Sequence, residues 1–170
     1  MNLVHHLVKK NKEKIVSFKL SKENRTYFKG ISKEFKIKLD MYYLCLMMGL
    51  AANNKSENPD AGELIDYWAD KYSDYANYII GLILFVEAKN IGIDISNKET
   101  TSQHLNNFLD PNQQSRLSLD KGFKEANRYA NGGIEIMKRK IPEPQLLGEF
   151  LIKYQEVLKE EIKTNENFIF

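Results

Sequence analysis

The sequence predicts a mainly α-helical protein in which a short strand and two helices are followed by a helical bundle. Apolar residues recur every three or four positions along most of the 170 residues, as on one face of a helix, whereas the best strand is a short alternating segment near the start. With 42% hydrophobic and 28% charged residues, the composition is that of an ordinary globular protein. We therefore expect a single domain over residues 1–170.

The expected strand-helix-helix unit covers residues 15–52. The stretch IVSFKLS (15–21) alternates apolar and polar residues, which predicts a strand covered on one face. Ser21 is a suitable N-cap for a first helix, whose buried face would carry Phe28, Ile31 and Phe35. Asp40 is the expected N-cap of a second helix, MYYLCLMMGLAANN, which is apolar nearly all round and must be buried on most sides. This order resembles a ribbon-helix-helix unit, whose paired strands enter a major groove of DNA.

The helical remainder covers residues 60–163. A long helix is expected from Asp60 to about Lys89, with an apolar side formed by Leu64, Trp68, Tyr72, Tyr75 and Ile79. These aromatic rings could stack on bases, but their spacing favours packing in the core. Residues 128–140 fit either one continuous helix, which we favour, or a helix-turn-strand, and a final amphipathic helix is expected over residues 145–163.

The small net charge of +2 is unevenly distributed along the chain. Residues 1–40 contain eleven Lys and Arg against four acidic residues and carry +7, whereas the remainder holds fourteen against nineteen and carries −5. Such an asymmetry indicates either a polyanionic partner or the assembly of oppositely charged surfaces.

The positive charge is concentrated on the expected first helix. At 100° per residue, one side of that helix gathers, within about 80°, a basic ridge of Lys22, Arg25, Lys29, Lys33 and Lys36. The preceding strand would present Ser17, Lys19 and Ser21 on its outward face. A ridge of this kind neutralises several phosphates with release of counterions, the main source of sequence-independent affinity for DNA. The alternative is an ordinary solvated face rich in lysine.

An acidic counterpart is expected on the long helix. Its carboxylates recur three or four residues apart, forming a stripe of Asp60, Glu63, Asp66, Asp70 and Asp74. Either this stripe is solvated, or Asp66, Asp70 and Asp74 dock against a basic surface of the same or a neighbouring subunit. A metal site is not expected, because carboxylates along a straight helix do not converge on one ion.

No feature of the sequence indicates catalysis. Nucleotide-binding, zinc-protease and serine-hydrolase motifs are missing, and His104 lies in a polar stretch without a nearby Cys or His. Cys45 has apolar neighbours and is expected in the core. The start of the chain lacks the pattern of a signal peptide, and no apolar run approaches the roughly 20 residues of a membrane span. We therefore expect a cytoplasmic protein that is not an enzyme and has no cofactor or metal.

Two stretches resemble the DndE family, the small helical subunit of the bacterial DNA phosphorothioation machinery. The first, LSKENRTYFKGISKEFKIKLDMYYLCLMMGL (20–50), has the short strand, the basic helix and the apolar helix of that family in the same register. The second is RYANGGIEIMKRK (128–140), which is similar to a late helix of the family. The resemblance implies a cytoplasmic, oligomeric accessory protein that binds DNA while partner enzymes place sulfur on its backbone. The residues it carries over are Lys22, Arg25, Lys29 and Lys33.

The leading hypothesis from the sequence is therefore a DNA-binding accessory subunit of a bacterial DNA-modification or phage-defence system. It would contact the backbone of double-stranded DNA non-specifically and work with other subunits of the system, as a homo-oligomer. The alternative is an oligomeric assembly subunit in which basic and acidic helix faces pair, with no role for nucleic acid.

Overall fold

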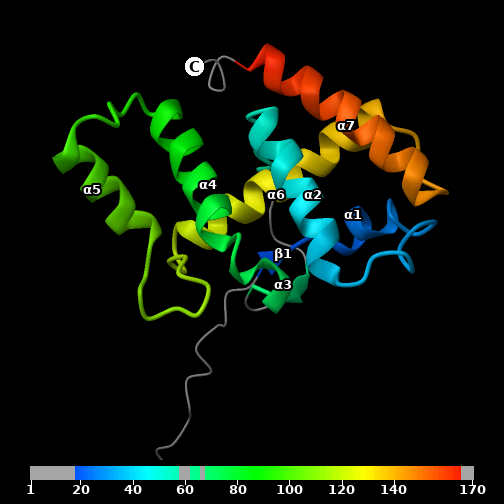
Figure 1. The fold of residues 1–170 in the computed structure, drawn as a ribbon, viewed down its shortest axis with the longest axis horizontal. Coiled ribbons are helices and arrows are strands. Elements are labelled where there is room, and N and C mark those ends of the chain that lie inside the picture. Colours follow the sequence, from blue (N-terminus) through cyan, green and yellow to red (C-terminus); the bar gives the residue numbers. More distant parts are fainter. Residues whose placement is uncertain (1–17, 58–61, 66–67, 166–170) are drawn as a thin grey trace, which may run out of the picture.

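Two long helices, α2 and α6, form the centre of the molecule. The computed structural model describes residues 18–57, 62–65 and 68–165. In chain order the elements are β1 (Phe18–Lys19), α1 (Lys22–Thr26), α2 (Lys38–Ala51), β2 (Glu63–Ile65), α3 (Asp70–Ser73), α4 (Ala76–Asn90), α5 (Lys98–Phe108), α6 (Gly122–Lys140) and α7 (Leu147–Thr164). Figure 1 shows α4 and α5 on one side of the central pair and α7 on the other. The predicted fold class, a strand-helix-helix start followed by a helical bundle, is confirmed.

The crossing of α2 and α6 brings their backbones into direct contact. A Cβ atom added at Gly49 would overlap the carbonyl of Tyr129, and one added at Gly133 would overlap the carbonyl of Cys45. Only glycine allows two helices to approach this closely, because any side chain would push them apart. The segment Asn131-Gly132-Gly133 is therefore neither a turn nor a flaw in the helix, and the favoured single helix over 128–140 is confirmed.

Side-chain amides of α6 hold β1 in place. On one edge β1 pairs antiparallel with β2 of the same chain. On the other edge the backbone N–H of Lys19 donates to Oδ1 of Asn127 at 2.8 Å, and Nδ2 of Asn131 donates to the carbonyl of Lys19 at 3.2 Å. The two amides thus satisfy backbone groups that a third strand would otherwise bind. In a ribbon-helix-helix protein the strand pairs with a second copy, whereas here both edges of β1 are occupied within one chain.

Aromatic rings fill the space between the small sheet and the central helices. The ring of Phe18 lies 4.5–5.0 Å, between centroids, from the rings of Tyr42, Trp68 and Phe123. Trp68 also donates its indole N–H to the carbonyl of Ser115 at 3.1 Å. One hydrophobic cluster extends from Phe18 to Val157 on α7, so the strand-helix-helix unit and the helical remainder share a core.

The structure corrects the expected long helix over residues 60–89. Residues 63–65 form β2 instead, and the helical part is divided into α3 and α4. The spacing that suggested one helix still places Trp68 and Tyr72 in the core, but Tyr75 is 61% exposed. Residues 63–65 pair with β1, and this tertiary contact outweighs the helical preference of the local sequence. Local preference alone is a weak predictor of structure where tertiary contacts compete with it. α4 then ends at Asn90, just before Gly92 adopts φ +70°, the left-handed conformation common after helices.

The other expected helices are present, but some of them begin at different residues. The second helix begins at Lys38, so Asp40 lies in its first turn, where its Oδ2 accepts the backbone N–H of Ile37 at 3.3 Å. The polar stretch that contains His104 forms α5, which begins at Lys98. The final helix is confirmed as α7, two residues later than expected at its start. No described helix is both long and apolar enough to cross a bilayer.

The glycine contact at the centre gives the first prediction. Gly133→Ala should lower the free energy of unfolding by at least about 2 kcal/mol, because the new methyl group overlaps the backbone of α2. The matched control is Gly81→Ala on the exposed side of α4, where no atom lies within 4 Å of the added Cβ. This control should be unchanged or stabilised by up to about 1 kcal/mol. Urea unfolding of the two variants measures the difference, and equal stabilities would contradict the close crossing.

Candidate nucleic-acid interface

The predicted basic ridge does not lie on one helix. α1 ends at Thr26, and the chain continues to Glu34 through tighter turns in which Phe28, Lys29 and Ile31 each bond to the residue three positions back. About three residues per turn brings Phe28 and Ile31 to the same buried side. The same tightening spreads the cations around the segment, so they do not form the single stripe that the helical spacing predicted.

The turns after α1 are held against the connection between α6 and α7. Tyr27 donates its hydroxyl to the carbonyl of Ile141 at 3.2 Å, and Glu34 accepts the backbone N–H of Leu147 at 3.3 Å. A Cβ at Gly30 would overlap the carbonyl of Pro144. The basic segment, which we define as residues 19–38, is therefore anchored along much of its length and presents its charges from a fixed backbone.

The six predicted phosphate-binding residues fall into two groups. Exposed positions are occupied by Lys22, Lys29, Lys33 and Lys36. Lys19 and Arg25 are only partly exposed, and Nε of Arg25 is buried without a hydrogen-bond partner among the described residues. The guanidinium of Arg25 extends beside Gly62 at the end of β2. The four exposed lysines are thus the direct candidates for phosphate contact, and Arg25 lies deeper.

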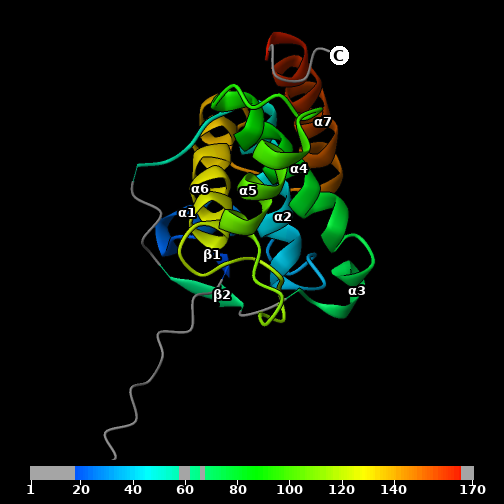
Figure 2. The same cartoon turned by 90° about the vertical axis from the view of Figure 1, so that its left-hand side faces the viewer.

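The end of α6 adds cations to this surface that the sequence reasoning missed. Nζ of Lys138 donates to Oδ1 of Asn24 on α1 at 2.8 Å, and Arg139 next to it is exposed. Figures 1 and 2 show α1 next to α6 in both views. The basic end of RYANGGIEIMKRK was visible in the sequence, but nothing local indicated that it would lie beside residues more than a hundred positions earlier. The two stretches that resemble the DndE family are neighbours in the fold.

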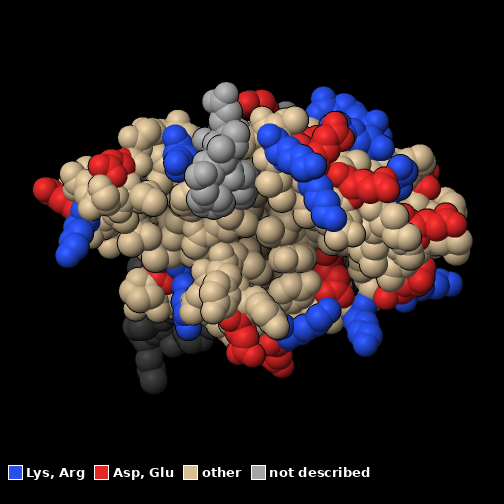
Figure 3. Space-filling view, turned by 45° about the horizontal axis from the view of Figure 1, so that its top comes forward, with Lys and Arg blue, Asp and Glu red and all other residues tan. Residues whose placement is uncertain are grey.

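Positive charge exceeds negative charge within the basic segment. The segment holds seven Lys and Arg against two carboxylates, Glu23 and Glu34, which leaves +5. None of the seven forms an ion pair with a described residue. The charges around α7 are different, because Lys140 pairs with Glu160 and Glu161, and Lys153 pairs with Glu156. Figure 3 shows this mixture of both signs at the end of the molecule that carries α7.

The predicted acidic stripe is not formed. Asp66 lies outside the described residues, Asp70 is the first residue of α3, and Asp74 follows the last residue of α3. Because residues 63–65 form β2 and α3 is four residues long, no continuous helix carries the stripe. The stripe on one long helix is therefore wrong, whereas contact of Asp66, Asp70 and Asp74 with a partner stays a prediction.

A buried charge cluster lies on the other side of α6 and was also missed. Nζ of Lys55 lies 2.5 Å from Glu87 and 2.7 Å from Glu125, and Tyr129 donates its hydroxyl to Glu87 at 2.5 Å. Arg128 completes the cluster at 3.3 Å from Glu125. Burial alone would raise the pKa of the Glu125 carboxyl, but the bonds and charges of Lys55 and Arg128 hold that pKa below its ordinary value. Two cations balance two buried carboxylates, so we interpret the cluster as structural.

The histidine and the cysteine that could have carried chemistry, His104 and Cys45, are both buried in the core. His104 is buried, and its Nε2 lies 3.1 Å from the carbonyl of Leu84. Cys45 is fully buried in α2, and burial raises the pKa of its thiol. Among the residues that the structure describes, no group of three or more His, Cys, Asp or Glu side chains could hold a metal ion.

Comparison with known proteins adds no further assignment. No protein-family model matches this chain, and neither a curated protein nor a solved structure matches it. The resemblance to the DndE family stays a prediction from the residues quoted above.

The charge cluster gives a pH prediction. Because the pKa of Glu125 is lowered in the folded state, its contribution to stability is complete above the ordinary value of 4.5 and is lost as the pH falls through the lower folded value. Glu125→Gln should therefore unfold more easily than the parent at neutral pH, by about 1–3 kcal/mol. The difference should shrink as the pH falls below 4.5 and disappear once it passes the lower folded pKa, where the parent carboxyl is protonated in the folded state as well.

The control for this prediction is Glu57→Gln. Glu57 is 91% exposed and lies 3.8 Å from Arg128, and an exposed pair of this kind contributes little. Thermal unfolding from neutral to acid pH should show no difference between this control and the parent. A Glu125→Gln deficit of constant size across the whole pH range would contradict the assignment.

Proposed function

We propose that this protein is a DNA-binding accessory subunit that contacts phosphates through the basic segment and the end of α6. The observation that carries the proposal is the net charge of +5 on residues 19–38, whose Lys and Arg side chains form no ion pair with a described residue. Lys138 and Arg139 at the end of α6 add two cations to the same surface. Uncompensated lysines on a fixed backbone can neutralise neighbouring phosphates and release their counterions. Such contacts recognise the backbone and not the bases, so the expected ligand is double-stranded DNA of any sequence.

The resemblance to the DndE family supports a narrower form of the proposal. In that form the protein acts in the bacterial cytoplasm, within a DNA-modification or phage-defence system, and other subunits carry out the chemistry. Both stretches that carry the resemblance contribute to the basic surface, through Lys22, Lys29 and Lys33 on one side and Lys138 on the other. Homo-oligomerisation is part of the same proposal. The rival hypothesis, in which acidic and basic helix faces pair, is less supported because no continuous helix carries the acidic residues.

A salt series tests the proposal. The parent should bind a short DNA duplex with an affinity that falls steeply with salt. The variant Lys22→Gln/Lys29→Gln/Lys33→Gln should bind more weakly. Its salt slope, the change in log affinity with log salt concentration, should be smaller in magnitude by about 0.9 for each phosphate that it no longer neutralises. Fluorescence anisotropy of a labelled duplex measures both quantities.

The matched control removes the same charge from α7. Lys153→Gln/Lys159→Gln/Lys163→Gln changes the net charge by the same amount at three exposed positions. It should keep the salt slope of the parent. Equal weakening in the two triple variants would mean that only net charge matters, and the proposed interface would then be wrong.

A further inference from the structure

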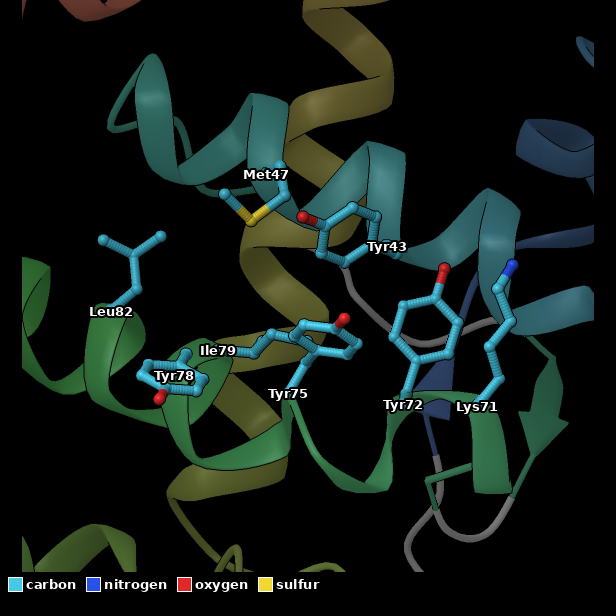
Figure 4. Close-up of a pocket in the computed structure, with 8 residues that line it drawn as sticks. All are labelled: Tyr43, Met47, Lys71, Tyr72, Tyr75, Tyr78, Ile79 and Leu82. Carbon is cyan, nitrogen blue, oxygen red and sulfur yellow. The ribbon is translucent and has the colours of Figure 1, made fainter.

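A groove lined by tyrosines lies between α2 and the α3–α4 segment. Its volume is about 620 Å³, and Figure 4 shows its walls. From α2 come Tyr43 and Met47, and from the other side come Tyr72, Tyr75, Tyr78 and Leu82. Four phenol rings around one open groove form a surface that is largely apolar and aromatic.

Two of these rings are exposed to an unusual degree. Tyr75 and Tyr78 are 61% and 77% exposed. The spacing in the sequence placed Tyr75 in the core, but the break between α3 and α4 turns it outward. The hydroxyls of Tyr43, Tyr75 and Tyr78 form no hydrogen bond with a described residue. The exposed rings of Tyr75 and Tyr78 are therefore available to a ligand, whereas Tyr43 packs on Tyr72 with ring centroids 5.4 Å apart, and the hydroxyl of Tyr72 is bound to Asp40 at 2.8 Å.

A second hollow lies next to the tyrosine groove and is lined in part by the basic segment. Its volume is about 560 Å³, and it is lined by Lys36 and Lys38 together with Asp70, the neighbour of Lys71 in the tyrosine groove. Asp40 lies between them, because one oxygen accepts the N–H of Ile37, which lines the second hollow, and the other accepts Nζ of Lys71, which lines the tyrosine groove, at 3.0 Å. The basic segment and the tyrosine groove are therefore neighbours on the surface.

The charges near the groove indicate whether the groove itself can attract phosphate. The three cations Lys36, Lys38 and Lys71 are opposed by the three carboxylates Asp40, Asp70 and Asp74, so this end is close to neutral. Attraction for phosphate must then come from the exposed lysines further along the segment, such as Lys22, Lys29 and Lys33. What the groove adds is ring surface.

We infer that the groove binds unpaired bases of single-stranded DNA, which stack on Tyr75 and Tyr78 while the flanking phosphates lie on the basic segment. This inference rests on the proposed function. A cationic track joined to exposed aromatic rings is the arrangement by which proteins hold single strands without reading their sequence. Paired bases cannot use the rings, because their faces are already stacked in the duplex. The protein would therefore hold DNA at places where the strands are separated.

The test compares three ligands: an oligothymidylate of about 12 nucleotides, a strand of the same length without bases, and a duplex. Tyr75→Ala/Tyr78→Ala should bind oligothymidylate about tenfold more weakly than the parent, because neither ring remains for a base to stack on. Its affinity for the base-free strand and the duplex should not change. Its salt slope should also stay that of the parent, since the variant keeps every cation. Tyr75→Phe/Tyr78→Phe keeps both rings and should bind all three ligands as the parent does.

Several results would overturn the inference. One is an alanine variant that binds oligothymidylate as tightly as the parent, and another is an equal weakening for all three ligands. Unchanged binding with a smaller mass in solution would show that the groove joins copies of the protein. In each case duplex binding by the parent still stands as the separate test of the proposed function. If the parent binds neither the duplex nor oligothymidylate, both ideas are wrong. Melting curves of both tyrosine variants confirm that they fold.

Discussion

The contact between the backbones of α2 and α6 is the constraint on which the rest of the structure depends. Gly49 and Gly133 allow the two helices to touch where a single methyl group would separate them. This closeness sets the position of Asn127 and Asn131, whose amides then reach the backbone of β1. β1 in turn fixes the start of α1, where the N–H of Ser21 donates to Asn131 at 3.3 Å. A contact between the backbones of the two central helices therefore determines where the charged surface begins.

The same arrangement separates two kinds of charge. On one side of α6 the ion pairs of Lys55 and Arg128 with Glu87 and Glu125 are closed and largely buried, and burial makes their complete pairing necessary. Beside α1 the lysines project from an anchored backbone into solvent without such partners among the described residues. A charge that is paired internally contributes to folding, whereas an exposed and unpaired one is available to a ligand. This difference, more than the net charge of +2, points to a polyanion.

The sequence predicted what depends on local pattern and missed what depends on distant contacts. The alternation of Phe18 and Leu20, the buried Cys45 and the helices α2, α6 and α7 were all expected, because each has its own periodicity or cap. The long helix after Asp60 was wrong because pairing with β1 is a tertiary effect. The prediction of a single basic helix was wrong because tight turns with three residues per turn follow α1. These turns bury Phe28 and Ile31 as well as a helix would, so the spacing of the apolar residues does not distinguish the two structures. Neither the approach of Lys138 to Asn24 nor the outward turn of Tyr75 leaves a local signal.

Hydrogen-deuterium exchange with and without duplex DNA tests the central claim most directly, because it shows which backbone segments the ligand covers. The account predicts slower exchange in two separate stretches, the basic segment at residues 19–38 and the end of α6 around Lys138 and Arg139. Exchange in α7 should be unchanged, because its Lys153 is paired with Glu156, and its Glu160 and Glu161 are paired with Lys140 at the end of α6. Protection confined to α7, or protection of one stretch without the other, would contradict a single surface built by the α2–α6 crossing.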